Sequence, residues 1–261
     1  MPALPRAKKR FGQHFLTDRH YVERIVQAIA PQPRDAMVEI GPGTGILTRP
    51  LAAKLDHLHV VEIDRDLAAA LRGEMPPAKV TVHEADALDF DFEALPAPMR
   101  VVGNLPYNVS TPILFRMSAI AARLLDCTFM LQKEVVERMV AEPATADYGR
   151  LSVMLQYRFE MALALRVPPG AFTPPPKVDS AVVRMRPLGA ERPRARDEAL
   201  FTRIVAAAFE QRRKMLRSAV RGVVEPHAFE SAGIDPTRRG ETLSVREFIA
   251  LADAALATRA G

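Results

Sequence analysis

The chain has 261 residues, 48% of them apolar and 26% charged, which is enough for one large α/β domain and a smaller appendage. No apolar run approaches the ~18 residues of a membrane span, and no apolar region follows the basic N-terminus, so we expect a cytoplasmic protein without a membrane partner. The single cysteine, Cys127, excludes internal disulfides and a cysteine-based zinc cluster, and we predict that it is buried and that no metal is bound.

Alternating short strands and helices fill the first half of the chain. Asp18 is expected to cap the first helix. A second helix is predicted to begin after Gly45 and to end at Leu55, and further helices are predicted over 64–74 and 111–123. The predicted strands are 36–40, 59–63, 79–82, 100–105 and 127–131. The alternation is typical of parallel strands with helical crossovers, so we predict an α/β fold with a doubly wound sheet.

The second half adds two strands and then becomes helical. Helices are predicted over 133–141 and 151–157, and strands over 159–167 and 181–185 complete a mostly parallel sheet of seven. The connection between these two strands is too short for a helical crossover, so we expect them to pair antiparallel. A linker is predicted over 187–196, and Ser244 with Glu247 caps the last helix. We therefore expect a catalytic domain over 1–186 and a small helical domain over 187–261.

A glycine-rich turn, Glu39-Ile-Gly41-Pro-Gly43-Thr-Gly45, follows a predicted strand and opens a helix. Glu62 ends the next strand, where an acid can hold ribose hydroxyls. The spacing differs from that of dinucleotide enzymes, and no Walker lysine is present. Glu39 would repel a pyrophosphate but tolerate a cation. S-adenosylmethionine, which combines a nucleoside with a sulfonium and an ammonium group, therefore fits best; a tight turn without a ligand is the alternative.

Asp86 follows the third predicted strand of the sheet. There its carboxylate could accept a hydrogen bond from the adenine amine of the cofactor. An aspartate that only caps a short turn is the alternative.

The sequence Asn104-Leu105-Pro106-Tyr107 comes where a strand should end over the binding site. An adenine N6 amine is a poor nucleophile, because its lone pair is delocalised into the ring. The Asn104 side-chain oxygen and the Leu105 carbonyl could accept its hydrogens and localise that pair. Pro106 stiffens the backbone and Tyr107 could stack on the base, so catalysis would be mainly positioning.

A second aromatic residue, Phe172, lies in the proline-rich loop 168–180. If the stiff loop exposed its ring, Phe172 could sandwich the target base with Tyr107. The alternative is a phenylalanine that covers an edge of the core.

Basic residues are concentrated between residues 184 and 217, which hold ten Arg or Lys and four acidic residues. Such a segment can neutralise phosphates, although a solvated helix face is the alternative. The cations that we expect to contact RNA are Arg10, Lys177, Arg212, Arg213 and Lys214.

Taken together, these motifs resemble the bacterial small-subunit rRNA adenine N6-dimethyltransferases, the kasugamycin-resistance methylases. The matching segments, in order, are 11–16, 38–45, 61–64, 103–112, 131–136, 148–155, 168–183 and 209–217. The resemblance implies a Rossmann-like class I methyltransferase. It would dimethylate two adjacent adenines in the 3′-terminal hairpin loop of small-subunit rRNA, acting as a monomer on a pre-ribosomal subunit during biogenesis.

The resemblance also implies a cofactor site. His14 and Leu16 would contact S-adenosylmethionine, mainly through backbone or polar groups. Joined to the motif analysis, it gives a cofactor set that is completed by Gly41, Gly43, Glu62, Asp86 and Asn104.

Three other functions compete with that of a small-subunit rRNA dimethyltransferase. The first is a large-subunit rRNA adenine methylase that confers antibiotic resistance, against which the 172–180 loop and the 211–214 helix argue. The second is a methylase-like RNA-binding factor in ribosome assembly or transcription, for which catalysis is secondary. The third, a nicotinamide dehydrogenase, is disfavoured by the glycine spacing.

Overall fold

The computed structural model describes residues 14–258, which form two compact units. The first unit comprises the described chain up to Val136 together with Glu160–Pro187, and the second comprises Glu137–Phe159 with the chain from Leu188 onward. A single division after residue 186 is therefore wrong. The physical reason is that Tyr148 and Tyr157 are buried in the same apolar core as Phe201 of the C-terminal helices.

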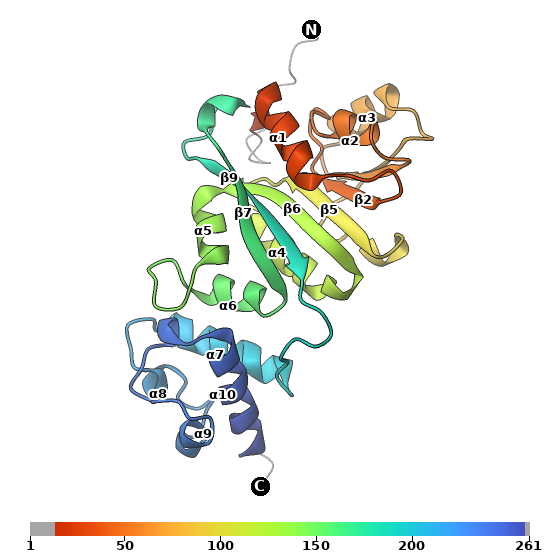
Figure 1. The fold of residues 1–261 in the computed structure, drawn as a ribbon. Coiled ribbons are helices and arrows are strands. Elements are labelled where there is room, and N and C mark those ends of the chain that lie inside the picture. The colour runs from red at the N-terminus through yellow and green to blue at the C-terminus, as the bar shows by residue number, and fades with distance from the viewer. Residues whose placement is uncertain (1–13, 259–261) are drawn as a thin grey trace. The chain divides into compact units, whose positions relative to one another are not determined.

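Seven strands form the main sheet, as predicted (Figure 1). They are β2 (Ala36–Ile40), β3 (Leu58–Glu62), β4 (Val80–Glu84), β5 (Met99–Asn104), β6 (Leu124–Gln132), β7 (Phe159–Val167) and β9 (Ser180–Pro187). Their order is β4-β3-β2-β5-β6-β9-β7. The pairs among β2, β3, β4, β5 and β6 are parallel, whereas β9 runs antiparallel to β6. The two late strands are neighbours, as expected.

The strand order reverses between β2 and β5. From β2 the chain builds outward through β3 to β4, and it then returns to place β5 on the other side of β2. In doubly wound sheets a crevice opens at this point, beyond the carboxyl ends of the strands. Glu39 on β2 lies opposite Val102 on β5, so the glycine-rich turn and the Asn104 loop leave the sheet side by side.

Helices connect the strands of the first unit. They are α1 (Arg19–Ile29), α2 (Thr48–Ala52), α3 (Arg65–Glu74) and α4 (Ser110–Ala119), with short 3-10 turns η2 (Phe92–Ala94), η3 (Ala121–Arg123) and η4 (Pro169–Ala171). Helix α5 (Lys133–Val140) begins in this unit and ends in the second. The Asp18 carboxylate accepts from the His20 N–H and caps α1, as predicted. The predicted helix through residue 55 ends at Ala52 instead.

The core of this unit lies around the middle of the sheet. On α1, Ile25, Val26 and Ile29 share one face and are buried with Val60 and Val102 from the sheet. Burying each such side chain stabilises the fold by roughly 1.5–3 kcal/mol. Cys127 on β6 is fully buried, as predicted, and burial raises its pKa well above the ordinary value.

A buried arginine crosslinks the other end of the sheet. Arg100 at the start of β5 donates to both carboxylate oxygens of Asp126, at 2.8 and 2.9 Å, and to Asp35 at 2.7 Å. It also donates to the carbonyl of Ile29, where α1 ends. A buried guanidinium is tolerated because each of these contacts compensates for lost hydration.

A second, two-stranded sheet was not predicted. β1 (Phe15–Leu16) pairs antiparallel with β8 (Phe172–Thr173), with Leu16 opposite Phe172. Strands of two residues are too short to produce a hydrophobic period, so only the tertiary structure reveals them. This sheet joins the chain before α1 to the proline-rich loop.

The second unit is helical. Its elements are α6 (Arg150–Gln156), α7 (Glu198–Glu210), α8 (Leu216–Ala219), α9 (Pro226–Ser231), η5 (Gly240–Thr242) and α10 (Val245–Ala257). Ser244 and Glu247 form the predicted capping box of α10. The predicted linker is anchored at Arg192, whose guanidinium lies 4.4 Å from the Tyr157 ring centre and donates to the Tyr157 carbonyl. Within residues 14–258, no helix is both long and apolar enough to cross a membrane.

Candidate active site

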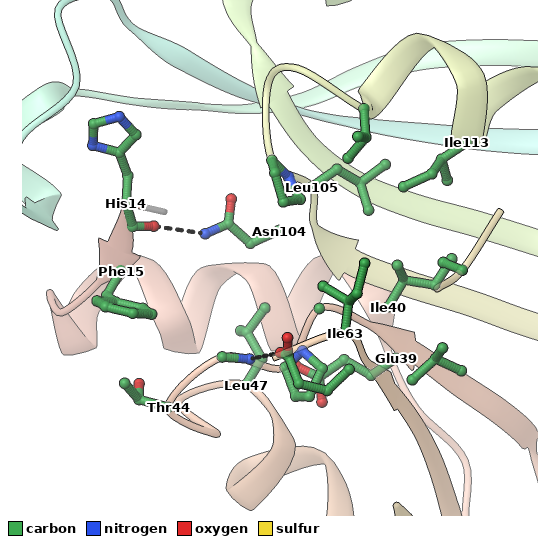
Figure 2. A pocket seen from close by; sticks show the side chains of 18 of the residues that line it. His14, Phe15, Glu39, Ile40, Thr44, Leu47, Ile63, Asn104, Leu105 and Ile113 are labelled. Atoms are coloured by element: carbon green, nitrogen blue, oxygen red, sulfur yellow. Dashed lines mark hydrogen bonds between the residues drawn. The ribbon is translucent and has the colours of Figure 1, made fainter. Parts of the chain in front are cut away.

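A pocket lies at the strand-order reversal, beyond the carboxyl ends of β2, β3 and β5 (Figure 2). Its walls come from the segment before α1, the glycine-rich turn, the end of β3, the turn after β4 and the Asn104–Tyr107 loop. The predicted site residues that line it are His14, Leu16, Gly41, Gly43, Glu62, Asp86, Asn104, Leu105, Pro106 and Tyr107. Segments far apart in the sequence therefore meet in one cavity.

The glycine-rich turn is possible because its glycines take left-handed backbone angles. Gly41 and Gly43 have φ values of +65° and +58°. Non-glycine residues rarely adopt such angles, and a side chain at Gly43 would also contact the Phe15 ring, 3.4 Å away. The turn consequently presents bare backbone to the pocket, as close approach of a ligand requires.

Glu62 is held in place by backbone groups at the end of β3. Its two oxygens accept from the Gly43 N–H at 3.0 Å and from the Asp64 N–H at 2.8 Å. Burial raises the pKa of this carboxyl, whereas the backbone hydrogen bonds oppose that shift. Each carboxylate oxygen keeps a second lone pair, which can accept from a ribose hydroxyl.

Glu39 is the most deeply buried acid of the pocket, with 1% of its surface exposed. Burial, with a smaller contribution from the nearby Glu62, raises its pKa to about 8. Its Oε2 atom has no hydrogen-bond partner within residues 14–258. A buried carboxylate without a partner is costly, so a cationic ligand group suits this position and a phosphate does not.

Asn104 ends β5 with a defined orientation. Its Nδ2 donates to the backbone carbonyl of His14 at 3.3 Å. Because that carbonyl can only accept, the amide NH₂ must face His14 and the amide oxygen points away from it (Figure 2). The oxygen is therefore free to accept from a ligand amine.

Tyr107 is half-buried and contacted on two sides. Its hydroxyl lies 2.9 Å from the Ser180 hydroxyl. Its ring is stacked on the His14 ring, with 5.7 Å between centres and 28° between planes. Burial raises the pKa of Tyr107, so the hydroxyl stays protonated at neutral pH.

Asp86 and Leu16 also lie in the pocket wall. The Asp86 Oδ1 accepts from the Leu88 N–H at 2.9 Å, which is the turn-capping alternative, while the residue still lines the pocket. Leu16 is 1% exposed, because its side chain packs into the core. Any contact from Leu16 to a polar ligand must therefore come from its backbone.

The expectation of an exposed Phe172 ring is wrong. The ring is 3% exposed and packs in the core with Leu16, Val167 and Ala171. Phe172 is also absent from the residues that line the pocket. The reason is the β1–β8 pairing, which turns this residue inward, as in the alternative of a core-edge phenylalanine.

The expected RNA-contacting cations differ in their surroundings. Lys177, Arg213 and Lys214 are exposed. Arg212 is exposed as well, but its guanidinium donates to Glu241 at 2.5 Å and to the Ala146 carbonyl at 2.6 Å. Arg10 lies outside the described residues.

Two contributors to the site were missed at the sequence level. Ile63 is 48% exposed although it directly follows the buried Glu62, and it lines the pocket. An apolar residue after a strand-ending acid was the available signal, because such a side chain can pack on a nucleoside ring. Ser180 gave no signal, since its contact with Tyr107 spans 73 residues. No group of three or more His, Cys, Asp or Glu suited to a metal is present over residues 14–258.

Known proteins are similar to this chain in sequence and in fold. A family model described as "Ribosomal RNA adenine dimethylase" matches residues 5–255. A protein of Aromatoleum aromaticum described as "Ribosomal RNA small subunit methyltransferase A" is 60% identical over 246 residues, covering 94% of this chain and 93% of that protein. One of Thiobacillus denitrificans with the same description is 58% identical over 252 residues, covering 97% and 98%.

Two solved structures are similar across nearly the whole chain. A dimethyladenosine transferase from Plasmodium falciparum has a TM-score of 0.79 and 22% identity, and the match covers 91% of this chain and 96% of that one. At this identity, the likeness supports the fold alone. The 23S rRNA methyltransferase ErmE has a TM-score of 0.71 and 26% identity, with 92% and 99% covered.

Proposed function

Because the chain belongs to the ribosomal RNA adenine dimethylase family, and is thus an S-adenosylmethionine-dependent rRNA adenine dimethyltransferase, we propose that it acts on small-subunit rRNA. The substrate would be two adjacent adenines in the 3′-terminal hairpin loop, each carrying two N6-methyl groups after reaction. The enzyme would act as a cytoplasmic monomer on a pre-ribosomal small subunit. The names of relatives at 58–60% identity support the choice of subunit.

The pocket residues fit S-adenosylmethionine. Glu39 offers a buried, unpartnered carboxylate oxygen to a cationic cofactor, and Gly41 and Gly43 leave room for close approach. Glu62 would hold the ribose hydroxyls and the second Asp86 oxygen the adenine amine, as the lone pairs left by their backbone contacts allow. When bound, the cofactor supplies an electrophilic methyl group on a sulfonium.

The target adenine would be activated by the Asn104 loop. The Asn104 oxygen and the Leu105 carbonyl would accept hydrogen bonds from the N6 amine, two in the first methylation and one in the second. These bonds favour a pyramidal nitrogen with a localised lone pair. Tyr107 stacks on the base, a contact worth about 1–3 kcal/mol, comparable with the cost of unstacking it. The remaining requirement is alignment, so these residues act mainly by positioning.

One observation carries this proposal: the His14 carbonyl fixes the Asn104 amide so that its oxygen points away from His14 (Figure 2). The direct test is transfer of labelled methyl groups to small subunits that lack the modification, followed by mapping of the modified bases. Label at two adjacent adenines of the 3′-terminal hairpin is expected. Large subunits serve as the control, and label in large-subunit rRNA alone would favour the rival that the likeness to ErmE suggests.

The role of Asn104 gives a second test. In Asn104→Ala, methyl transfer should fall by roughly 100-fold or more, as when an oriented polar group of an active site is lost. S-adenosylmethionine affinity, measured by calorimetry, should fall only partly, because Glu39 and Glu62 remain. Asn104→Asp keeps an acceptor but loses the donor to His14, so intermediate turnover is expected. Near-normal turnover in Asn104→Ala would contradict the assigned role and favour a factor for which catalysis is secondary.

A further inference from the structure

Ser180 gives the Tyr107 ring a fixed point of attachment. Ser180 is the first residue of β9 and is fully buried. It lies opposite Gln132 in the antiparallel β6–β9 ladder, so its backbone is held by the sheet. Its Oγ lies 2.9 Å from the Tyr107 hydroxyl. The far end of the tyrosine is therefore tied to the sheet, although its backbone belongs to a loop.

His14 holds the same ring from another side. Its imidazole is stacked on the Tyr107 ring. Its Nδ1 lies 2.9 Å from the Pro174 carbonyl, and because a carbonyl only accepts, Nδ1 carries the proton. The hydrogen bond fixes the plane of the imidazole, which in turn limits rotation of the tyrosine.

Both supports depend on the proline-rich loop. Ser180 ends the loop, and Pro174, which bonds to His14, lies within it. The same loop contains β8 (Phe172–Thr173), which pairs with β1 directly after His14. Immobilising a flexible side chain on binding costs roughly 0.5–1.5 kcal/mol. Here the ordering occurs when the protein folds, so an incoming base does not have to restrain the ring.

We propose that Ser180, with His14, is a positioning residue that holds the Tyr107 ring in the orientation that receives the target adenine. The inference rests on the proposed role of Tyr107 in stacking on that base. Ser180 acts through the tyrosine hydroxyl and does not touch the cofactor or the reacting atoms. The proline-rich loop thereby contributes to catalysis through a serine, with its phenylalanine buried in the core.

The experiment is a double-mutant cycle on the wild-type full chain, Ser180→Ala, Tyr107→Phe and the double variant. Each single variant removes one side of the same hydrogen bond. We expect kcat for rRNA methylation to fall about 3- to 10-fold in each, the size of one hydrogen bond. The double variant should lose no more than either single variant. The Kd for S-adenosylmethionine should stay unchanged in all three.

A matched control separates positioning from general stability. Ser152 is also fully buried. Its hydroxyl donates to the Arg138 carbonyl and accepts from the Gly149 N–H, both within the second unit. Ser152→Ala should therefore lower the melting temperature at least as much as Ser180→Ala and leave kcat unchanged. If Ser180→Ala fails to fold, Tyr107→Phe still reports on the same contact.

Three results would overturn the inference. They are normal kcat in Ser180→Ala, losses that multiply in the double variant, or an equal loss of kcat in Ser152→Ala. Wild-type enzyme that leaves small-subunit adenines unmodified would instead refute the proposed function. The two failures are therefore distinguishable in one set of assays.

Discussion

At the scale of single residues, two buried acids, Glu39 and Glu62, set the electrostatics of the pocket. Glu39 is buried beside Glu62. Burial and the negative charge of Glu62 both disfavour ionisation of Glu39, and burial has the larger effect. The folded protein without ligand consequently holds a proton on Glu39 at neutral pH, because its pKa is raised to about 8. A cationic ligand favours the ionised form, so its binding is linked to loss of that proton.

This linkage predicts the pH dependence of cofactor binding. Below pH 8, binding of S-adenosylmethionine should release protons, and its affinity should rise between pH 6.5 and 8 before levelling off. Calorimetry in two buffers with different ionisation enthalpies measures the protons released. Glu39→Gln should bind more weakly and lose this pH dependence. Proton release that persists unchanged in Glu39→Gln would assign the linkage to another group.

The same shift has the opposite sign for stability. Because the folded-state pKa of Glu39 lies above the ordinary value of 4.5, the unfolded chain releases this proton first as the pH rises. The contribution of Glu39 therefore falls between about pH 4.5 and pH 8, and the desolvation cost is complete above that range. Glu39→Gln, which stays neutral, should therefore gain in melting temperature relative to wild type as the pH rises over that range.

At the scale of elements, the small β1–β8 sheet connects the cofactor side of the site to the proline-rich loop. Its pairing places Leu16 opposite Phe172 and leaves His14 next to the Asn104 amide. It also explains why Phe172 is buried. The small sheet thus stabilises the core and places His14 for its hydrogen bonds with the Asn104 amide and the Pro174 carbonyl.

Substitution of Phe172 distinguishes a core residue from a base-stacking one. Phe172→Leu preserves most of the buried apolar volume, so kcat should stay within about 3-fold of wild type and stability should fall by under ~1.5 kcal/mol. Phe172→Ala should cost roughly 3–5 kcal/mol in urea unfolding. Tyr107→Leu is the contrasting variant: activity should be lost, whereas stability should fall only by about 1–3 kcal/mol, because the buried Ser180 hydroxyl loses its partner. A large loss of kcat in a stably folded Phe172→Leu would instead indicate that the Phe172 ring stacks on the target base.

The turn after α7 holds adjacent arginines with different roles. Arg212 pairs with Glu241 and the Ala146 carbonyl, whereas the exposed Arg213 has no hydrogen-bond or ion-pair partner for its side chain among residues 14–258. Arg213→Ala should weaken RNA-subunit binding and reduce the salt slope by about one, with no change in melting temperature. Arg212→Ala should mainly lower the melting temperature. The same salt slope in wild type and Arg213→Ala would remove this turn from the RNA surface.

At the scale of the whole molecule, each of the two compact units has an apolar core among the described residues 14–258. One surrounds the sheet, and the other joins α6, α7, α8, α9 and α10. The pocket lies in the first unit, so ligand binding should stabilise the two cores unequally. A single unfolding free energy then describes the protein poorly.

Hydrogen exchange can test this separation. S-adenosylmethionine at 100 times its Kd should add about 2.7 kcal/mol to the unit that binds it. Amide exchange should slow in β2, β5 and the glycine-rich turn, and stay unchanged in α7 and α10. Equal slowing in α10 would show that the two cores unfold as one.

Most of the sheet and the cofactor chemistry could be predicted from the amino-acid sequence. Alternating apolar runs located all seven strands within a few residues, because local hydrophobic pattern and turn residues act over short distances. The helix caps at Asp18 and Ser244 were predictable because each side chain bonds to a residue only two or three positions further along the chain. The glycine-rich turn and Asn104 were found because their chemistry requires particular residue types at a fixed spacing.

Contacts between segments far apart in the chain could not be predicted and are known from the folded structure. The inward turn of Phe172, the bond from Ser180 to Tyr107 and the assignment of residues 137–159 to the helical core depend on strand pairing and on packing across many residues. A single sequence contains no record of which distant segments meet. Which segments meet is decided by the free energy gained when they bury apolar surface against one another. That surface is buried only in the folded chain.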